Sequence, residues 1–223
     1  MSKQTDLINV MDAITVDGSN NVGIGTSSPS SYASTTLEIK GSSTTSDIKM
    51  TNTTTGVGDA AGYDLELNGN DINYVNRTAG GNQKFWTNST ERMRIDAVGR
   101  VTTPYQPAFC TTGNSFSATI FKGTVLLNNG NYYDTSTGRF SAPVAGLYAF
   151  SFNQTTEDTN SHFTYISVNG GNQNGYQLSY GVIYQSATQN IVVSLAAGDY
   201  VEGRRRDTGY NVYRANFSGY LIG

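Results

Sequence analysis

The sequence predicts an all-β protein, and three observations predict it. Almost no segment of the 223 residues shows a helical period of apolar residues. Short segments rich in Val, Ile, Thr, Tyr and Phe recur along the chain, and Gly and Asn turns separate them. The exception is Thr5 to Ile14, whose apolar residues could line one face of a short helix. Such a helix is too short to be stable without a partner.

Composition limits the partners of this chain. Charged residues make up 14% and the net charge is −3, without a sustained basic run. Duplex nucleic acid and anionic membranes are therefore not expected partners. No stretch of about 18 apolar residues predicts a transmembrane helix, so no membrane insertion is expected. The single cysteine, Cys110, cannot form an intrachain disulfide, and the first residues lack an apolar signal segment. These features predict synthesis in a cytosol.

Residues 17–103 predict brief, polar strands. Each expected strand offers only two or three apolar residues, too few to offset the entropy of ordering the region alone. Three copies around an axis could share a core, so we expect a trimeric β-rich shaft or collar here, preceded by a docking segment at 1–16. Disorder over 41–62 is the alternative. The expected strands are 36–40, 47–50, 64–67, 72–75, 84–86 and 92–95.

A weak internal repeat lies in this region. Val16–Val22 and Ile95–Val101 share the order apolar residue, Asp, four turn-like residues, Val. Arg92–Val101 and Asn21–Pro29 resemble pieces of a module common in bacteriophage tail fibres and related virion appendages. In that module the pieces follow one another, whereas here they are separated and reversed in order.

Residues 104–223 predict a globular β-sandwich, because the strands become longer and alternate clearly. Leu147–Phe152 and Asn190–Leu195 each place three apolar residues on one face, and Phe217–Leu221 repeats the pattern. A final strand in the middle of a sheet would hold this end of the domain. The residues expected to face the core are Tyr148, Phe150, Phe152, Ile191, Val193, Leu195, Phe217 and Leu221.

One spacing in this half is specific. It comprises Asn128, Tyr133, Phe140, Gly146, Tyr148, Phe150 and Phe152. The spacing resembles the signature of the C1q globular head, one of the tumour-necrosis-factor-like jelly rolls. The leading Phe of that signature would fall on Lys122, one place after Phe121, which a single-residue bulge or loop shift explains. The resemblance covers about 105–223. It implies a ten-stranded jelly roll that packs as a trimer and binds partners without catalysing a reaction.

Candidate catalytic and metal sites are weak. His162 is the only histidine, so it would have to serve any nucleophile–base pair, and zinc sites built from Cys and His are excluded by count. Asp64, Glu66 and Asp71 are the least implausible acids for glycan cleavage, but solvated surface charge is the favoured interpretation. We expect no enzyme and no cofactor. Some C1q-like heads hold calcium near the trimer axis, and Glu157 and Asp158 are the candidate ligands.

Two segments are candidate receptor contacts. Gly203–Asn211 carries Arg204, Arg205, Arg206 and Tyr210, and arginine forks bind carboxylates and phosphates bidentately. Ion pairs across a trimer interface are an equal alternative for these arginines. Asn169–Tyr176 predicts a flexible loop for sugar contact through Asn172, Gln173, Asn174 and Tyr176, or else a plain hairpin turn.

The resulting hypothesis is a homotrimeric bacteriophage fibre or tail-tip attachment protein. Its C1q-like head would bind a host-surface glycan or protein, and its N-terminal segment would bind other virion proteins. The protein would be located in the virion after synthesis in the host cytoplasm. The alternative is a virion structural or decoration protein that never reads a receptor.

Overall fold

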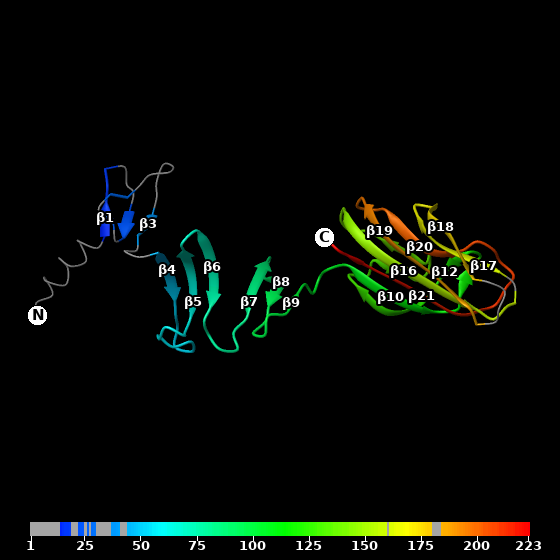
Figure 1. Ribbon diagram of the computed structural model, residues 1–223, viewed down its shortest axis with the longest axis horizontal. Helices are drawn as coiled ribbons and strands as arrows, with labels where there is room; N and C mark the ends of the chain where they lie inside the picture. The colour runs from blue at the N-terminus through cyan, green and yellow to red at the C-terminus, as the bar shows by residue number, and fades with distance from the viewer. Residues whose placement is uncertain are drawn as a thin grey trace, which may run out of the picture. The chain divides into compact units, whose positions relative to one another are not determined.

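A computed structural model describes residues 14–18, 22–24, 26, 28–29, 37–40, 44–159, 161–179 and 184–223, with the side chains of 172–179 left out. The chain divides into two compact units, Met1–Thr102 and Thr103–Gly223 (Figure 1). Every regular element of the described residues is a β-strand, so the all-β class is confirmed. None of the described residues forms a helix able to cross a membrane. The helix expected over 5–14 lies outside the described residues, apart from Ile14, which begins a strand.

The N-terminal unit contains three small sheets, each of three strands. The first holds β1 (Ile14–Val16), β2 (Val22–Ile24) and β3 (Leu37–Ile39). The second holds β4 (Thr45–Met50), β5 (Tyr63–Asn68) and β6 (Asp71–Asn76). The third holds β7 (Gln83–Thr87), β8 (Thr90–Ile95) and β9 (Val101–Thr102). All the strands expected in this half are therefore present.

The internal repeat corresponds to two hairpins with the same closing pair. Val16 lies opposite Val22 in the first sheet, and Ile95 lies opposite Val101 in the third. In the second hairpin, Asp96 caps the turn by accepting the backbone N–H groups of Val98 and Arg100, both at 3.0 Å. These hydrogen bonds hold the pKa of the Asp96 carboxyl below its ordinary value. The Asp that follows the apolar residue is thus a turn residue.

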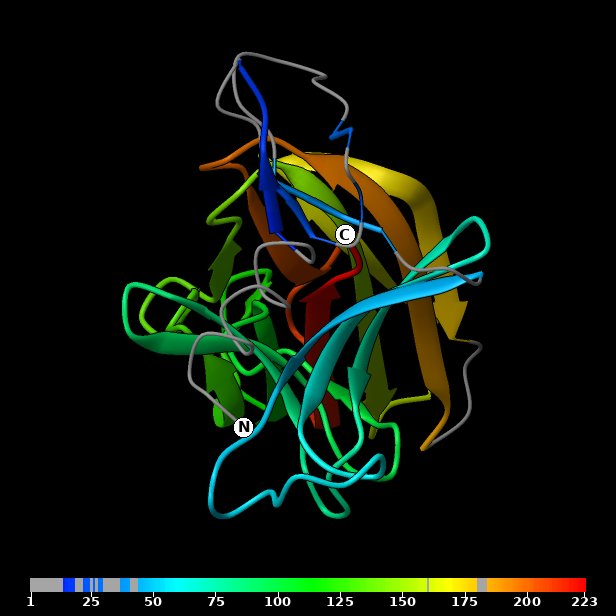
Figure 2. The ribbon, with the colours of Figure 1, turned by 90° about the vertical axis from the view of Figure 1, so that its left-hand side faces the viewer.

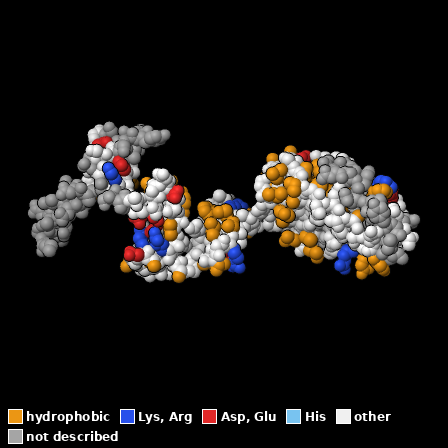
Figure 3. Space-filling model, viewed as in Figure 1, with side chains coloured by type: hydrophobic (Ala, Val, Ile, Leu, Met, Phe, Trp, Pro, Cys, Tyr) orange, Lys and Arg blue, Asp and Glu red, His pale blue; other side chains and the backbone are white. Residues whose placement is uncertain are grey.

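The β4–β6 sheet has two chemically different faces, because side chains alternate along each strand. Ile48, Leu65 and Tyr74 form a cross-strand row on one face. The other face carries acidic and basic side chains, visible as adjoining red and blue groups in Figure 3. Figure 2 shows the twist of this sheet, whose strands are coloured blue to cyan.

The C-terminal unit is a sandwich of two antiparallel sheets. One sheet has the order β13-β10-β21-β16-β19. In the other, β20 pairs with β12, β15 and β17, and β17 pairs with β18. The strands are β10 (Ala108–Gly113), β11 (Phe116–Ser117), β12 (Ile120–Phe121), β13 (Thr124–Asn129), β14 (Tyr133–Asp134), β15 (Arg139–Ser141), β16 (Gly146–Thr156), β17 (His162–Val168), β18 (Gly171–Ser179), β19 (Ser186–Leu195), β20 (Tyr200–Arg205) and β21 (Val212–Leu221). This arrangement is the predicted jelly roll.

Aromatic rings fill the space between the two sheets. Phe109 stacks on Tyr133 and on Phe140, with ring centres 5.0 Å apart in both pairs, and it meets the edge of Phe217 at 4.9 Å. The residues expected to face the core do so: Tyr148, Phe150, Phe152, Ile191, Leu195 and Phe217 are buried, and Val193 and Leu221 pack against them from partly buried positions. The alternation in the sequence therefore identified the core.

Strand β21 lies in the middle of its sheet, as expected, between β10 and β16 (Figure 1). The sheet can pack tightly there because position 219 is glycine. A Cβ on Gly219 would lie 2.3 Å from a ring carbon of Phe150 and 2.9 Å from one of Phe109. Gly219 therefore makes room for two core rings.

A β-bulge lies close to the departure from the expected spacing. Cys110 of β10 pairs with Leu127 of β13, but the next residue, Thr111, pairs with Val125. Leu126 is the extra residue between them, so β13 contains a β-bulge. The bulge lies between Phe121, which is fully buried, and Asn128. An extra residue at this point agrees with the one-residue offset, and its assignment as the cause of the offset stays a prediction.

Candidate functional site

The sheet β13-β10-β21-β16-β19 turns one face to the core and the other outward. The outward face, here called the outer face, is defined by alternate residues of its three adjoining strands β21, β16 and β19. Strand register places Val192, Ala149 and Tyr220 in one row across it, and Asn190, Ser151 and Ser218 in the next. The outer face is therefore one continuous surface built from three aligned strands.

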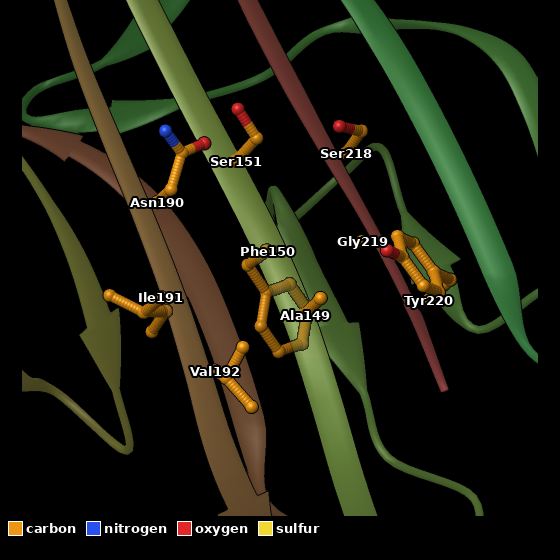
Figure 4. A pocket seen from close by; sticks show the side chains of 9 residues that line it. All are labelled: Ala149, Phe150, Ser151, Asn190, Ile191, Val192, Ser218, Gly219 and Tyr220. Carbon is orange, nitrogen blue, oxygen red and sulfur yellow. The ribbon is translucent and has the colours of Figure 1, made fainter. Parts of the chain in front are cut away.

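One end of the outer face is apolar. Val192 and Tyr220 remain 64% and 56% exposed, and the small Ala149 lies between them in the row. This arrangement leaves a shallow hollow of about 340 Å³ over strands β16, β19 and β21 (Figure 4). Leu147 and Ile222 extend the apolar end, since the Ile222 backbone N–H donates to the Leu147 carbonyl at 2.7 Å.

The other end of the outer face is polar but almost uncharged. Asn153 donates to the hydroxyl of Thr188 at 2.7 Å, and Thr155 and Ser186 share a hydrogen bond of 2.7 Å. Arg214, which pairs with Thr155 across the strands, is the only charged residue of the outer face in β16, β19 and β21. Apart from Arg214, the outer face therefore offers a contact surface without charges that need desolvation.

Gly203–Asn211, here called the arginine segment, begins on the other sheet, at the end of β20. Glu202 of β20 is fully buried, and its carboxylate accepts hydrogen bonds from Arg204 Nε at 2.7 Å and from Arg139 Nε at 2.8 Å. The bond to Glu202 raises the pKa of the Arg139 guanidinium above its ordinary value. Arg139 also lies over the ring of Tyr200, 4.0 Å from its centre. The carboxylate of Glu202 thus joins two arginines within one chain.

Arg205 and Arg206 are also held within the chain. The Arg205 guanidinium lies between the rings of Phe116 and Tyr210, 4.6 and 5.0 Å from their centres, and donates to the carbonyls of Ala118 and Tyr210. Arg206 lies 3.7 Å from the ring centre of Phe163, and its Nε donates to Asp207 at 3.0 Å. The three arginines predicted to contact a receptor have intramolecular partners, and their contact with any partner stays a prediction.

Tyr210 is a supporting residue of this segment. It is 8% exposed, and Gln154 Nε2 donates to its hydroxyl oxygen at 2.8 Å. Its ring stacks on that of His162, with centres 3.5 Å apart. Burial raises the pKa of the Tyr210 hydroxyl above its ordinary value. Sequence reasoning placed Tyr210 at a contact surface, whereas the structure places it beneath the arginine segment.

The amide-rich segment is not a loop. Asn169 and Gly170 have positive φ angles of 50° and 84° and connect β17 to β18 directly. A two-residue turn with both φ angles positive is typical of a type I′ hairpin, which Asn-Gly favours. The loop interpretation of Asn169–Tyr176 is therefore wrong and the hairpin interpretation is right. The predicted contact residues Asn172, Gln173, Asn174 and Tyr176 belong to β18, and their side chains lie outside the described residues.

The other candidate side chains lie in contact with residues of the same chain. Asp64 and Glu66 both bond the guanidinium of Arg77, and His162 is buried at the start of β17. Asp158 lies 3.7 Å from His162, and the Glu157 backbone N–H donates to the Asn211 carbonyl. Within the described ranges, no group of three or more His, Cys, Asp and Glu side chains is placed to hold a metal ion. The calcium ligands therefore stay a prediction.

Comparison with known proteins agrees with this architecture. Residues 108–222 match the C1q domain family. The match covers the whole sandwich from β10 to β21, including the spaced aromatic residues of its core. The chain therefore belongs to the C1q family, and Thr103–Gly223 is called the C1q domain below.

Relatives match the same half of the chain. Complement C1q tumor necrosis factor-related protein 3 of Homo sapiens is 36% identical over 115 residues, which cover 49% of this chain and 46% of that protein. Complement C1q tumor necrosis factor-related protein 6 of Rattus norvegicus is 34% identical over 110 residues, 44% of this chain and 40% of that protein. The chain thus spans less than half the length of these relatives.

Solved structures similar to this chain include the globular domain of zebrafish complement 1qA protein. It is 22% identical with a TM-score of 0.44, over 53% of this chain and 98% of that one. Murine APRIL is 12% identical with a TM-score of 0.42, over 52% of this chain and 99% of that one.

The prediction of a bacteriophage attachment protein is wrong, and so are its virion alternative and its virion location. The matched relatives are animal proteins related to C1q and tumour necrosis factor. The fibre-like motif consists of short turn-rich segments in the N-terminal unit, outside the matched residues 108–222. Such hairpin turns recur in many β proteins, so they are a weak indicator of function. The expected virion partners and host-surface receptor are therefore no longer supported. The expected self-association is compatible with the C1q family.

Proposed function

We propose that this protein is a non-catalytic binding protein whose C1q domain self-associates as a homotrimer through the outer face. The observation that supports it is the outer face itself, which combines an exposed apolar end with an almost uncharged polar end. Exposed apolar surface of this kind is typical of protein–protein contacts. Membership of the C1q family supports the choice of a second and third copy as the partners.

The chemistry of the outer face suits contact between copies. The hollow over Ala149, flanked by Val192 and Tyr220, can receive an apolar side chain of a neighbouring copy. Each apolar side chain removed from water contributes about 25 cal/mol per Å² of buried surface. The serine, threonine and asparagine rows can exchange hydrogen bonds at the contact without burying charge.

A trimer would present three copies of the second sheet and its arginine segment. Three identical sites on one rigid assembly gain avidity even where each site is weak. The contacts within the segment restrain the guanidinium groups of Arg204 and Arg205, which lowers the entropic cost of binding through them. We therefore propose this segment as a partner-contacting surface of the C1q domain.

The test is the oligomeric state of the full chain with a charge placed on the outer face. Val192→Glu and Tyr220→Glu each bury an unpaired carboxylate if the proposed contact forms. We expect each variant to raise the dissociation constant of the trimer at least tenfold, and the double variant to raise it further. Light scattering after size-exclusion chromatography and sedimentation velocity measure this.

Thr135→Glu is the matched control, because it adds the same charge to an exposed turn between β14 and β15. The control should keep the parent mass. Near-ultraviolet circular dichroism checks that the aromatic core of each variant is intact. The proposal is overturned if the parent chain is monomeric, or if both glutamate variants remain trimeric with unchanged affinity.

A further inference from the structure

The β4–β6 sheet of the N-terminal unit carries an unpartnered apolar face. Register places Ile48, Leu65 and Tyr74 in one row of this face, and Leu67 and Ile72 in the next. Met50 continues the same side of β4. These six side chains, here called the apolar collar face, are between 37% and 65% exposed. None of them is charged.

The opposite face of the same sheet carries charged side chains that form ion pairs. Arg77 bonds the carboxylates of Asp64 and Glu66, the latter at 3.3 Å, and Lys49 lies 4.0 Å from Asp64. The bond to Asp64 raises the pKa of the Arg77 guanidinium above its ordinary value. A sheet with ion pairs on one side and bare apolar side chains on the other normally packs its apolar side against another layer.

Among the described residues, Leu37 and Ile39 of β3 line a hollow beside this face, but they leave its six side chains at least 37% exposed. The hydrophobic residues that form a buried core all lie between Phe109 and Phe217, in the C1q domain. A three-stranded sheet without a packed face is marginally stable in water. The β4–β6 sheet therefore needs a partner that covers the apolar collar face.

The neighbouring β7–β9 sheet repeats the division. Glu91 bonds Arg94 at 2.7 Å and lies 3.4 Å from Lys84 on one side. Phe85 pairs with Met93 across the strands on the other side, and Phe85 is 50% exposed. Trp86 is an exception, since register pairs it with Glu91 on the charged side. Tyr74 of β6 and Phe85 of β7 line one hollow, so the apolar sides of the two sheets adjoin there.

We infer that the apolar collar faces of three copies of this chain pack against one another, so that the N-terminal unit is a second trimerisation element. The number of copies rests on the proposed homotrimer of the C1q domain. A second copy is the fitting occupant because an uncharged face offers no charge complementarity to a charged partner, and because trimerisation of the C1q domain would hold three identical faces at high local concentration. The charged sides of the sheets would then face water.

Disulfide trapping in the full chain tests this inference. Cys110 is the only cysteine, so the Cys110→Ser chain is a clean background. Leu65→Cys and Tyr74→Cys place a thiol on the apolar collar face. Asn73→Cys, next to Tyr74 on the same strand but on the other face, is the matched control. Mild oxidation should link the thiols of two of the three copies, converting up to about two-thirds of the chains to covalent dimers.

The result expected is rapid dimer formation for Leu65→Cys and Tyr74→Cys and at least a tenfold slower reaction for Asn73→Cys. A trimeric background chain in which the three cysteine variants react equally slowly overturns this inference alone. A monomeric background chain overturns both this inference and the proposed C1q trimer.

Hydrogen exchange provides a second measurement for variants that disturb packing. Leu65→Glu should abolish the protection of backbone amides in 63–76 while amides of the C1q domain stay protected. Asn73→Glu should leave both regions protected. Unchanged protection of 63–76 in Leu65→Glu contradicts the inference.

Discussion

The two units of this chain use the same residue types in opposite ways. In the C1q domain, aromatic and aliphatic side chains lie between two sheets, and Phe109 contacts both Phe140 and Phe217. In the described part of the N-terminal unit, comparable side chains such as Ile72 and Trp86 are more than half exposed. The C1q domain carries its own hydrophobic core, whereas the buried hydrophobic residues of the described chain include none from the N-terminal unit. Stability within a single chain is therefore expected to differ sharply between them.

Ion pairs show the same difference. Glu202 of the C1q domain and Glu91 of the N-terminal unit each join two basic side chains. The Glu202 side chain is 0% exposed and the Glu91 side chain is 15% exposed. Removing one partner of a buried pair strongly lowers the stability of the protein. The loss becomes smaller as the pair becomes more accessible to water.

The largest expected effect comes from the core. Phe217→Ala should lower the free energy of unfolding of the C1q domain by about 4 kcal/mol, because it removes a fully buried ring and leaves a cavity. Phe85→Ala, at a half-exposed ring of the N-terminal unit, is the matched control. Chemical denaturation followed by near-ultraviolet circular dichroism measures the first, and fluorescence of the single Trp86 follows the N-terminal unit. Equal losses for the two variants would remove the contrast between the units.

A smaller effect is expected at the buried carboxylate. Glu202→Gln should cost about 3 kcal/mol, since it removes the charge that pairs with Arg139 and Arg204. Glu91→Gln should cost clearly less, because Glu91 is more accessible to water than Glu202 and both of its partners are about 40% exposed, which screens the pair. Urea denaturation of both variants against the parent chain measures the difference. A loss from Glu91→Gln as large as that from Glu202→Gln would contradict the comparison.

Alkaline pH should lower the stability of the C1q domain by a smaller amount than these substitutions. Burial raises the pKa values of Tyr133, Tyr148 and Tyr210, all in the C1q domain. Because an unfolded tyrosine ionises near pH 10, the stability these groups contribute is complete below about pH 10 and is lost as the pH rises through the raised values.

Ultraviolet absorbance of tyrosinate measures this titration. The buried tyrosines should ionise late and together with loss of the near-ultraviolet signal. If all tyrosines of the chain ionise in a single step near pH 10 without loss of that signal, the three rings are accessible in the folded domain and the expectation is wrong.

The smallest effect is expected at an exposed pair. Asp207→Asn should change the free energy of unfolding by less than about 0.5 kcal/mol, because Arg206 and Asp207 are 44% and 43% exposed. The same denaturation experiment measures it. A loss of more than about 1 kcal/mol would mean that the arginine segment contributes to the stability of the domain and does not only present side chains.

The core of the C1q domain could be predicted because its signal is local. Alternation over 147–152 and 190–195 assigns the inward faces without knowledge of strand pairing. For the amide-rich segment the sequence leaves a loop and a hairpin turn open, because its polar composition favours the first and its Asn-Gly pair favours the second, which is the one present.

The candidate sites could not be predicted in the same way, because they depend on pairing between distant residues. Glu202 is joined to Arg139 across 63 positions of sequence, and the row Val192, Ala149 and Tyr220 unites three separate strands. Alternation shows which residues point outward, but it does not show which of them become neighbours. For this reason the sequence did not reveal that Glu202 pairs with Arg139 and Arg204.

The central position of β21 has a consequence for how the C1q domain is made. Strands β10 and β16 are separated in their sheet by β21, and Phe109 lies opposite Gly219, about a hundred residues later in the chain. During synthesis both strands emerge from the ribosome well before the strand that joins them, with unpaired edges and apolar side chains exposed. Folding dominated by such distant pairings is slow. The nascent chain therefore passes through a period in which the unpaired edges of β10 and β16 are open to aggregation until β21 is made.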